Sequence, residues 1–270
     1  MTNEKVVKMF GLSFNACTLE QATELIVAAG ESHRKGLVDT PNVDHLVQMD
    51  EDKEMRQLFE HAMFSFADGM PLVWFSKLFM QSPLPERVTG ADLLPSVAHM
   101  AADRGVKLFF LGGNPGVAEQ AATALTQLNP GLQVVGAYSP PFGFEHDEQE
   151  STRIVTMINE SGADILFVGV GAPKQEKWAG SHLSELHTGP VLGVGASFDF
   201  AAGTVKRAPL FFQRSGLEWL WRLLKEPTRM WERYIIRDSR FVRLAFIEWR
   251  KIRRRIRRKS RRKVSDNILK

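Results

Sequence analysis

Short apolar runs alternate with longer amphipathic segments along the chain as far as about residue 208. The runs are rich in Val, Leu, Ile and Phe and are bounded by polar or glycine-containing stretches, which is typical of β-strands. We therefore predict strands at residues 6–14, 36–42, 63–67, 106–112, 132–138, 163–169 and 190–196.

The segments between these runs carry apolar residues at helical spacing. Thr18 and Gln21 have the spacing of a capping box, which predicts that the first helix begins there. Further helices are predicted at residues 43–62, 91–104, 117–128, 148–160 and 174–187.

This alternation predicts the α/β class, with a Rossmann-like, mostly parallel sheet sandwiched by helices. The apolar sequences at residues 106–111 and 165–170 are nearly continuous, as expected for interior strands that are covered on both faces. Ligands bind such sheets at the carboxyl ends of the strands, so the residues directly after each strand are the first candidates for a site.

Beyond residue 208 the strand pattern ends, and the sequence becomes helical and rich in Trp and Arg. Pro227 is predicted to divide this segment into two helices, because proline is poorly tolerated inside a helix. We therefore expect an α/β catalytic domain at residues 1–208 and a basic helical appendage at residues 209–270.

Charge divides the chain unequally, although the net charge is only +4. Residues 227–270 hold 17 Lys and Arg against four Asp and Glu, a net charge of +13, which leaves −9 for the rest. Residues 250–263 alone contain 11 basic residues and no acidic one. This asymmetry indicates an anionic partner, such as a membrane surface, a nucleic acid or a phosphorylated substrate.

Several features predict a cytoplasmic protein bound peripherally to the inner face of the plasma membrane. The single cysteine, Cys17, allows no internal disulfide, and the N-terminal sequence lacks a signal peptide. The uncharged stretches fall short of the roughly 18 apolar residues that span a bilayer. Four tryptophans near the basic run favour a lipid headgroup interface, although a helix packed on its own domain is the alternative: Trp219, Trp221, Trp231 and Trp249.

Three glycine-rich segments follow predicted strands, at residues 112–116, 169–173 and 193–195. Glycine lets the backbone approach a ligand, and a following helix offers free N–H groups to phosphate; a tight strand-to-helix turn is the alternative. The chain has neither G-x-G-x-x-G nor a Walker sequence, which argues against a dinucleotide oxidoreductase and a P-loop NTPase.

Polar residues at the predicted strand ends are the candidates for chemistry. Asp68 is the best candidate for a general base, with a turn aspartate as the alternative. Thr40 and Asn42 suit a sugar or a base, although Asn42 also suits a helix N-cap. Arg87 suits a diphosphate. Gln175 suits sugar hydroxyls or a uracil edge, unless it lies in a solvated first helical turn.

Metal-binding patterns are weak in this sequence. Residues 50–52, Asp-Glu-Asp, resemble an Asp-x-Asp metal motif but fall inside a predicted helix, where a solvated face is expected. The seven histidines lack zinc-ligand spacing. We therefore expect no metal and no cofactor, with phosphate charge met by arginines and helix termini.

Taken together and in order, these segments resemble the WecG/TagA/CpsF family of glycosyltransferases. The resemblance covers about residues 8–240. It is carried by residues 40–42, 67–69, 86–90, 112–116, 169–176, 195–199, 207–209, 217–219, 222 and 226–227.

The resemblance implies an inverting, UDP-sugar-dependent transferase that needs no metal. It would move N-acetylmannosamine, N-acetylmannosaminuronate or glucose to a polyprenyl-diphosphate-linked saccharide in cell-surface or exopolysaccharide biosynthesis. Asp68 matches the catalytic aspartate. The resemblance implies donor contacts from Thr40, Asn42, Arg87, Gly112, Gly113, Gly171, Lys174 and Gln175, and diphosphate or acceptor contacts from Arg207, Arg222, Arg229 and Arg233. A structural or lipid-facing role is the alternative for these last four arginines.

One departure from the family leaves the donor sugar open, because residues 137–142 read Ala-Tyr-Ser-Pro-Pro-Phe where many members have Gly-Tyr-Phe. Two other functions compete. A nucleic-acid-binding protein would use the basic tail but leaves Asp68 and Gln175 without a role. A nicotinamide-dependent enzyme would use the glycine turns. We expect no nucleic acid partner, and homo-oligomer formation stays open.

Overall fold

The computed structural model describes residues 5–225, 227–231 and 237–268. Side chains are described up to residue 255, apart from those of residues 214, 222, 229 and 230.

Six strands form one sheet in the order β4, β3, β8, β7, β5, β6, and every neighbouring pair is parallel. The predicted α/β class and parallel sheet are therefore confirmed. β5 and β7 lie inside the sheet, as their continuous apolar sequences predicted. The strands are β3 (Gly36–Asp39), β4 (Phe64–Ser65), β5 (Lys107–Gly112), β6 (Gln133–Tyr138), β7 (Ile165–Gly169) and β8 (Pro190–Gly193).

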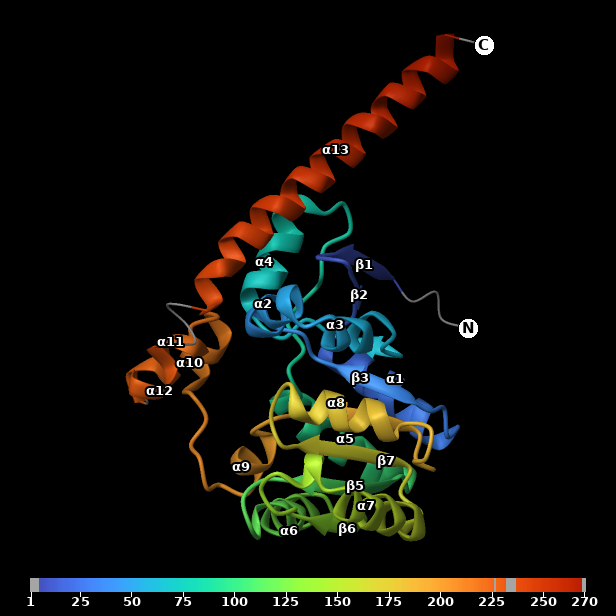
Figure 1. Ribbon diagram of the computed structural model, residues 1–270, viewed down its shortest axis with the longest axis vertical. Coiled ribbons are helices and arrows are strands. Elements are labelled where there is room, and N and C mark those ends of the chain that lie inside the picture. The colour runs from blue at the N-terminus through green and yellow to red at the C-terminus, as the bar shows by residue number, and fades with distance from the viewer. Residues whose placement is uncertain (1–4, 226, 232–236, 269–270) are drawn as a thin grey trace.

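Helices cover both faces of this sheet (Figure 1). Phe110 and Phe167 pack in one hydrophobic cluster and their neighbours Phe109 and Leu166 in another, because alternate residues of a strand face opposite layers. The first layer contains α1 (Leu19–Glu31), α5 (Gly90–Arg104), α6 (Val117–Leu128) and α9 (Ser197–Ala201). The second contains α7 (Glu148–Ser161) and α8 (Lys174–His182), with a short 3-10 helix, η1 (Phe144–His146), before α7.

The predicted helix starts are accurate where a capping residue marks them. Thr18 and Gln21 form the predicted capping box of α1. α8 ends at His182, five residues before the predicted end, so this boundary was wrong. Residues 183–185 form turns, and the His187 N–H donates to the Asn159 side chain at 2.7 Å instead of continuing the helix.

The first predicted strand, residues 6–14, is instead a hairpin outside the main sheet. β1 (Val6–Met9) pairs antiparallel with β2 (Leu12–Asn15). The chain turns at Phe10 and Gly11, whose φ angles are 55° and 86°. Buried positions alternate on each side of the turn but change phase across it, and this change of phase is the signal that the one-strand prediction overlooked.

The helix predicted at residues 43–62 is two helices, α2 (Val43–Glu51) and α3 (Lys53–Glu60). Asp52 has extended backbone angles, and its carboxylate accepts a hydrogen bond from the Met55 N–H at 3.0 Å, capping α3. Residues 50–52 therefore form a helix junction rather than the face of one helix. Glu51 pairs with Arg240, and Asp52 lies 2.7 Å from the Lys177 ammonium.

One helix, α4 (Met70–Phe79), was not predicted, because its sequence is apolar on most sides and lacks a helical alternation. It packs in a third hydrophobic cluster with the β1–β2 hairpin and the last long helix.

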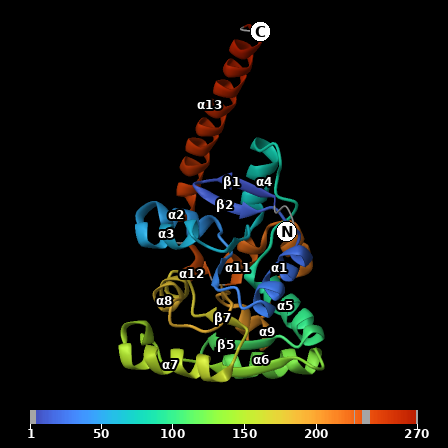
Figure 2. The same cartoon turned by 90° about the vertical axis from the view of Figure 1, so that its right-hand side faces the viewer.

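The chain after residue 208 is helical, as predicted, but it contains more than two helices. Pro227 begins a helix, in agreement with the predicted break. The longest helix, α13, begins against α2 and α4 and then projects away from the rest of the molecule (Figures 1 and 2). The elements are α10 (Leu210–Arg214), α11 (Glu218–Lys225), α12 (Pro227–Trp231), the 3-10 helix η3 (Asp238–Arg240) and α13 (Phe241–Ile268).

Within the described ranges, no helix is both long enough and apolar enough to cross a membrane.

The main chains of β5 and β7 lie in close contact at Gly112, and this contact requires a residue without a side chain at that position. Its φ is +130°, and a Cβ added there would lie 2.6 Å from the carbonyl group of Gly169. We expect Gly112→Ala to lower the free energy of unfolding by roughly 2–5 kcal/mol, combining backbone strain with overpacking. Urea unfolding followed by circular dichroism measures this.

Gly162 supplies the matched control, because its φ is +65° and an added Cβ meets nothing within 4 Å. Gly162→Ala should cost only about 1–2 kcal/mol, from backbone strain alone. Equal losses in the two variants would contradict the packing argument.

Candidate functional site

Loops that leave the carboxyl ends of β3, β4, β5 and β7 place most of the predicted residues along one edge of the sheet. Asp68 follows β4 and is partly buried. Its N–H donates to the carbonyl of Pro41 at 2.9 Å, which ties the loop after β4 to the loop after β3. Gly69, with φ of 115°, then turns the chain into α4. The structure thus holds Asp68 between two neighbouring strand ends.

Thr40 and Asn42 lie in the adjoining loop after β3. Thr40 is buried, and Asn42 caps α2 by accepting the His45 N–H at 3.1 Å. The capping alternative for Asn42 is therefore correct, and a direct donor contact from its side chain stays a prediction.

The glycines of the two central loops lie against each other. Gly113 donates its N–H to the Gly169 carbonyl at 2.9 Å, so the turns after β5 and β7 are held together. Gly171, with φ of 84°, has nothing within 4 Å of the position of a Cβ. An open space therefore adjoins Gly171 at the position that a side chain would take.

Gln175 is buried, so the alternative of a solvated first turn in α8 is wrong. Its Oε1 accepts hydrogen bonds from the N–H groups of Gly171 at 3.2 Å and Gly195 at 3.0 Å. Its Nε2 donates to Glu176 Oε1 at 2.8 Å. Gln175 therefore links the loop after β7 to the loop after β8.

Lys174 lies beside Gln175 in sequence but has different contacts. Its ammonium lies 2.6 Å from Glu145 and 4.3 Å from the ring centroid of Phe142. The structure thus connects Lys174 to the loop after β6, the same loop whose sequence departs from the family.

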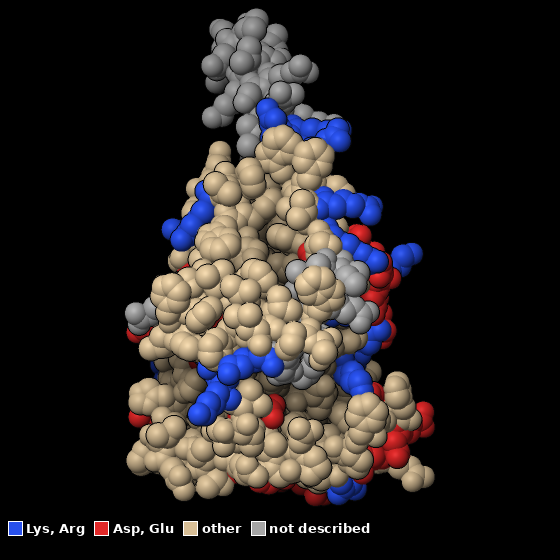
Figure 3. All heavy atoms as spheres, turned by 90° about the vertical axis from the view of Figure 1, so that its left-hand side faces the viewer, with Lys and Arg blue, Asp and Glu red and all other residues tan. Residues whose placement is uncertain are grey.

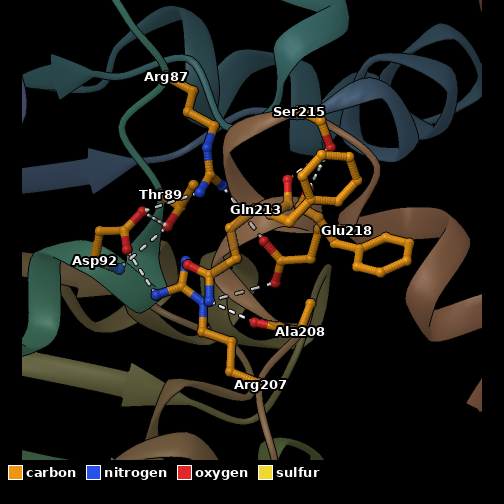
Figure 4. A network of polar contacts seen from close by, with 10 residues as sticks. Arg87, Thr89, Asp92, Arg207, Ala208, Gln213, Ser215 and Glu218 are labelled. Atoms are coloured by element: carbon orange, nitrogen blue, oxygen red, sulfur yellow. Dashed lines mark hydrogen bonds and ion pairs between the residues drawn. The ribbon is translucent and has the colours of Figure 1, made fainter.

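Arg87 and Arg207 belong to one polar network that joins α5 to α11 (Figure 4). Arg207 donates to Asp92 at 2.6 Å, and Arg87 donates to Glu218 at 3.4 Å. Thr89 caps α5 and also donates to Asp92 at 2.8 Å. The two arginines predicted to meet phosphate are therefore brought together, each beside a carboxylate.

The network changes the protonation equilibria of its members. Burial alone would raise the pKa of Asp92, but the hydrogen bonds from Arg207 and Thr89 outweigh burial and lower it. Burial would lower the pKa of Arg207, but the bond to Asp92 and the charge of Glu218 raise it. Asp68 contributes in the same direction, which places its carboxylate within electrostatic reach of Arg207.

Four acidic residues at this edge were not singled out by the sequence interpretation as site residues: Asp39, Asp92, Glu176 and Glu218. Asp39 and Glu176 are almost fully buried. An acidic residue that ends an apolar strand, as Asp39 does, is a signal that could have been used. The contact of Glu218 with two arginines joins distant segments, and no local pattern predicts it.

Three predicted arginines lie outside the described side chains. The backbones of Arg222 and Arg229 belong to α11 and α12, and Arg233 falls outside the described residues. Their roles stay predictions.

Among the described residues, no group of three or more His, Cys, Asp and Glu side chains is arranged to hold a metal ion. The expected independence from metals and cofactors stays a prediction.

The Asp92 carboxylate between two arginines should stabilise the folded protein. We expect Asp92→Asn to lower the free energy of unfolding by roughly 1–3 kcal/mol near neutral pH, because partly buried guanidinium groups lose their counter-charge. The folded pKa lies below the ordinary value of 3.8. This stability is therefore present above that value and lost as pH falls through the folded pKa.

Asp103→Asn, an exposed substitution on the same helix, is the control and should change stability by less than about 0.5 kcal/mol. Urea unfolding at neutral and acidic pH measures both variants. A difference between wild type and Asp92→Asn that does not shrink in acid would contradict the charge argument.

Comparison with protein families gives one match that spans most of the chain. Residues 7–255 match the family described as the glycosyl transferase WecG/TagA/CpsF family. The match includes the strand-end loops, the arginine network and the first half of α13. This family makes surface polysaccharides and uses a sugar donor and an acceptor substrate. The chain therefore belongs to the WecG/TagA/CpsF family of glycosyltransferases.

Proposed function

We propose that the protein transfers a sugar, with inversion, from a UDP-sugar to a polyprenyl-diphosphate-linked saccharide. The sugar is N-acetylmannosamine, N-acetylmannosaminuronate or glucose. The observation that carries this proposal is the position of Asp68 at the carboxyl edge of the sheet, within electrostatic reach of Arg207 and beside the loops after β3 and β4.

Asp68 is the general base of the proposed reaction. Its carboxylate takes the proton from the acceptor hydroxyl while that oxygen attacks the anomeric carbon and the bond to the UDP oxygen breaks. Attack from the face opposite the leaving group gives inversion. A placed base of this kind supplies about 10² to 10⁴ in rate.

The donor lies along the strand-end loops in this proposal. The uridine diphosphate approaches the main chain at Gly112, Gly113 and Gly171, and of these three glycines Gly171 has open space beside it. Thr40, Asn42 and Gln175 lie on the adjoining loops and support donor binding either directly or by shaping those loops.

The leaving UDP gains negative charge, which the arginines stabilise. Arg87 and Arg207 are the described members of this set, and Arg222, Arg229 and Arg233 are added from the family resemblance. In this proposal the arginines take the place that a metal ion has in other transferases.

The proposed location is the cytoplasmic face of the plasma membrane, and three features support it. Figure 3 shows a broad face on which uncharged residues predominate, with Lys and Arg toward its upper edges and across its lower middle. The Lys225 ammonium and the Arg253 guanidinium also lie over tryptophan rings, at 5.1 and 4.8 Å. Exposed apolar side chains concentrate on α4 and the C-terminal helices, at Trp74, Leu78, Leu210, Phe211, Trp219, Leu224, Trp231, Val242, Phe246 and Ile247.

We expect Asp68→Ala and Asp68→Asn to reduce sugar transfer by about 10² to 10⁴, because the acceptor hydroxyl loses its base. UDP binding and the unfolding midpoint should stay close to those of wild type. The assay is transfer of radiolabelled sugar from UDP-sugars to a membrane lipid extract. Near-normal turnover in both variants would contradict the role of Asp68 as the base. If wild type transfers sugar from no UDP-sugar, the proposed donor class is wrong.

The basic end of α13 should control membrane attachment. We expect replacement of the six Lys and Arg between residues 257 and 263 by Gln to release the protein from vesicles that contain anionic lipid. The reason is that each basic residue near such a surface contributes roughly 1 kcal/mol. Truncation after residue 255 should release the protein from the same vesicles. It keeps Ile252, which is buried against α4 and the hairpin.

Sedimentation with vesicles of phosphatidylcholine and phosphatidylglycerol measures this attachment, with pure phosphatidylcholine vesicles as the control. Unchanged sedimentation of both variants would refute the role of the basic segment. Salt-sensitive binding to DNA or RNA that outcompetes the anionic vesicles would favour the nucleic-acid alternative instead.

A further inference from the structure

Two carboxyl groups are buried side by side at the carboxyl ends of the central strands. Asp39 ends β3 and is 4% exposed, and Glu176, in the first turn of α8, is 5% exposed. β3 pairs with β8 so that Val38 lies opposite Leu192, which places Asp39 beside Gly193.

Gly193 provides the space in which α8 approaches Asp39. A Cβ added to Gly193 would lie 2.7 Å from Gln175 Nε2 and 3.2 Å from Glu176 Oε1. The first turn of α8 therefore lies directly over Gly193, next to the end of β3.

Neither carboxyl group has a cationic partner among the described side chains. The nearest lysines in sequence point elsewhere, since Lys174 pairs with Glu145 and Lys177 pairs with Asp52 and Glu54. One oxygen of each carboxyl group, Asp39 Oδ2 and Glu176 Oε2, also lacks a hydrogen-bond partner in the described structure. Two such groups cannot both carry a negative charge at low cost.

The protonation equilibria agree with this geometry. Burial, and then the charge of Glu176, raise the pKa of Asp39 well above its ordinary value. Burial raises the pKa of Glu176 to about 7, although hydrogen bonds from Gln175 and the backbone oppose this rise. Near neutral pH, Glu176 is therefore close to its midpoint, and Asp39 is harder to ionise than an ordinary aspartate.

Other titratable groups on the surrounding elements have partners of their own. On α2, Asp44 lies 2.7 Å from Arg237, and His45 accepts the Asn42 N–H. On α3, Asp52 and Glu54 face Lys177, and on η1 Glu145 faces Lys174. On β4, Ser65 lies opposite Asp39 and carries no ionisable group.

The pair is connected to the loops that the donor is proposed to use. Glu176 Oε1 accepts from Gln175 Nε2, and Gln175 Oε1 in turn accepts from Gly171 and Gly195. Any change in the charge or position of Glu176 therefore reaches both loops through a single amide.

We propose that Asp39 and Glu176 form a buried carboxyl pair that does not carry two negative charges at once and acts as a positioning device, fixing Gln175 and the loops after β7 and β8 for the nucleoside diphosphate. This inference rests on the proposed function for its ligand. Ionisation adds negative charge to the pair, which weakens the packing of α8 and opposes an anionic ligand nearby.

The test compares wild type with Glu176→Gln, which keeps the shape but stays neutral, over about pH 5.5 to 8.5. Bound UDP disfavours ionisation of Glu176. If binding raises the pKa of Glu176 by about one, the affinity of wild type falls about tenfold across the titration. UDP itself titrates in this range, with a second phosphate pKa near 6, so the quantity measured by calorimetry is the ratio between the two proteins.

Stability gives a readout that needs no ligand. The folded pKa of Glu176 is raised from 4.5 to about 7. Its contribution to stability is therefore complete below the ordinary value and lost as pH rises through the folded value. The Tm of wild type should fall relative to that of Glu176→Gln as pH rises through this window. Glu160→Gln, an exposed substitution on α7, should follow wild type in both measurements.

A second pair of variants separates positioning from simple space filling. Asp39→Asn keeps a neutral hydrogen-bonding group and should bind UDP within about threefold of wild type at acidic pH, whereas Asp39→Ala should lose about tenfold or more. Transfer assays on the same variants should show the loss mainly in KM for the donor, because Asp68 is untouched.

If wild type and Glu176→Gln have identical pH profiles in both UDP affinity and Tm, the proposal of a carboxyl pair is wrong. If the Tm difference between wild type and Glu176→Gln changes with pH as expected but the ratio of their UDP affinities does not, the pair has no role in donor binding. If wild type fails to bind UDP at all, the proposed donor class fails, and the Tm comparison alone still decides whether Glu176 resists ionisation in the folded protein.

Discussion

The close contact of main chains at the carboxyl ends of β5, β7 and β8 is the constraint on which the site depends. Gly112 lies against Gly169, and a Cβ on Gly169 would meet Phe198 at 2.6 Å. Gly193 accepts the first turn of α8 in the same way. Without these glycines the strand ends would separate by the width of side chains, and the loops that Gln175 connects would lie beyond the reach of one amide.

Charge is organised at this edge in two different ways. Asp92 pairs with Arg207 in the polar network, where the pKa of Asp92 is lowered and the carboxylate keeps its charge. Asp39 and Glu176 lie deeper, without a cation among the described side chains, where burial raises the pKa of both. Aspartate thus serves as a counter-charge in one place and resists ionisation in another, and the presence or absence of an arginine partner decides between the two.

The sequence predicted the sheet, its layers and the position of Asp68, because apolar periodicity and strand-end position are local features. It failed where the outcome depends on a change of phase, as at Gly11, or on a side chain that competes for backbone groups, as at Asp52. The hydrogen-bond partners of Gln175 and Arg207 could not be predicted from the sequence either. Both residues were chosen for chemistry by type, yet their contacts come from segments brought together only by the fold.

A nucleoside diphosphate would add negative charge to an edge whose described cations are already matched. Arg87 and Arg207 face Asp92 and Glu218, and the carboxylate of Asp68 lies within electrostatic reach of Arg207. Binding of the ligand therefore calls for the two Arg207 nitrogens that lack a hydrogen-bond partner in the described part of the chain, Nε and Nη2, or for cations from elsewhere. Residues 227–270 carry the surplus of +13 that the acidic remainder lacks. Because Glu218 joins α11 to this edge, the network is the point at which the basic helices can meet the charge that the reaction develops.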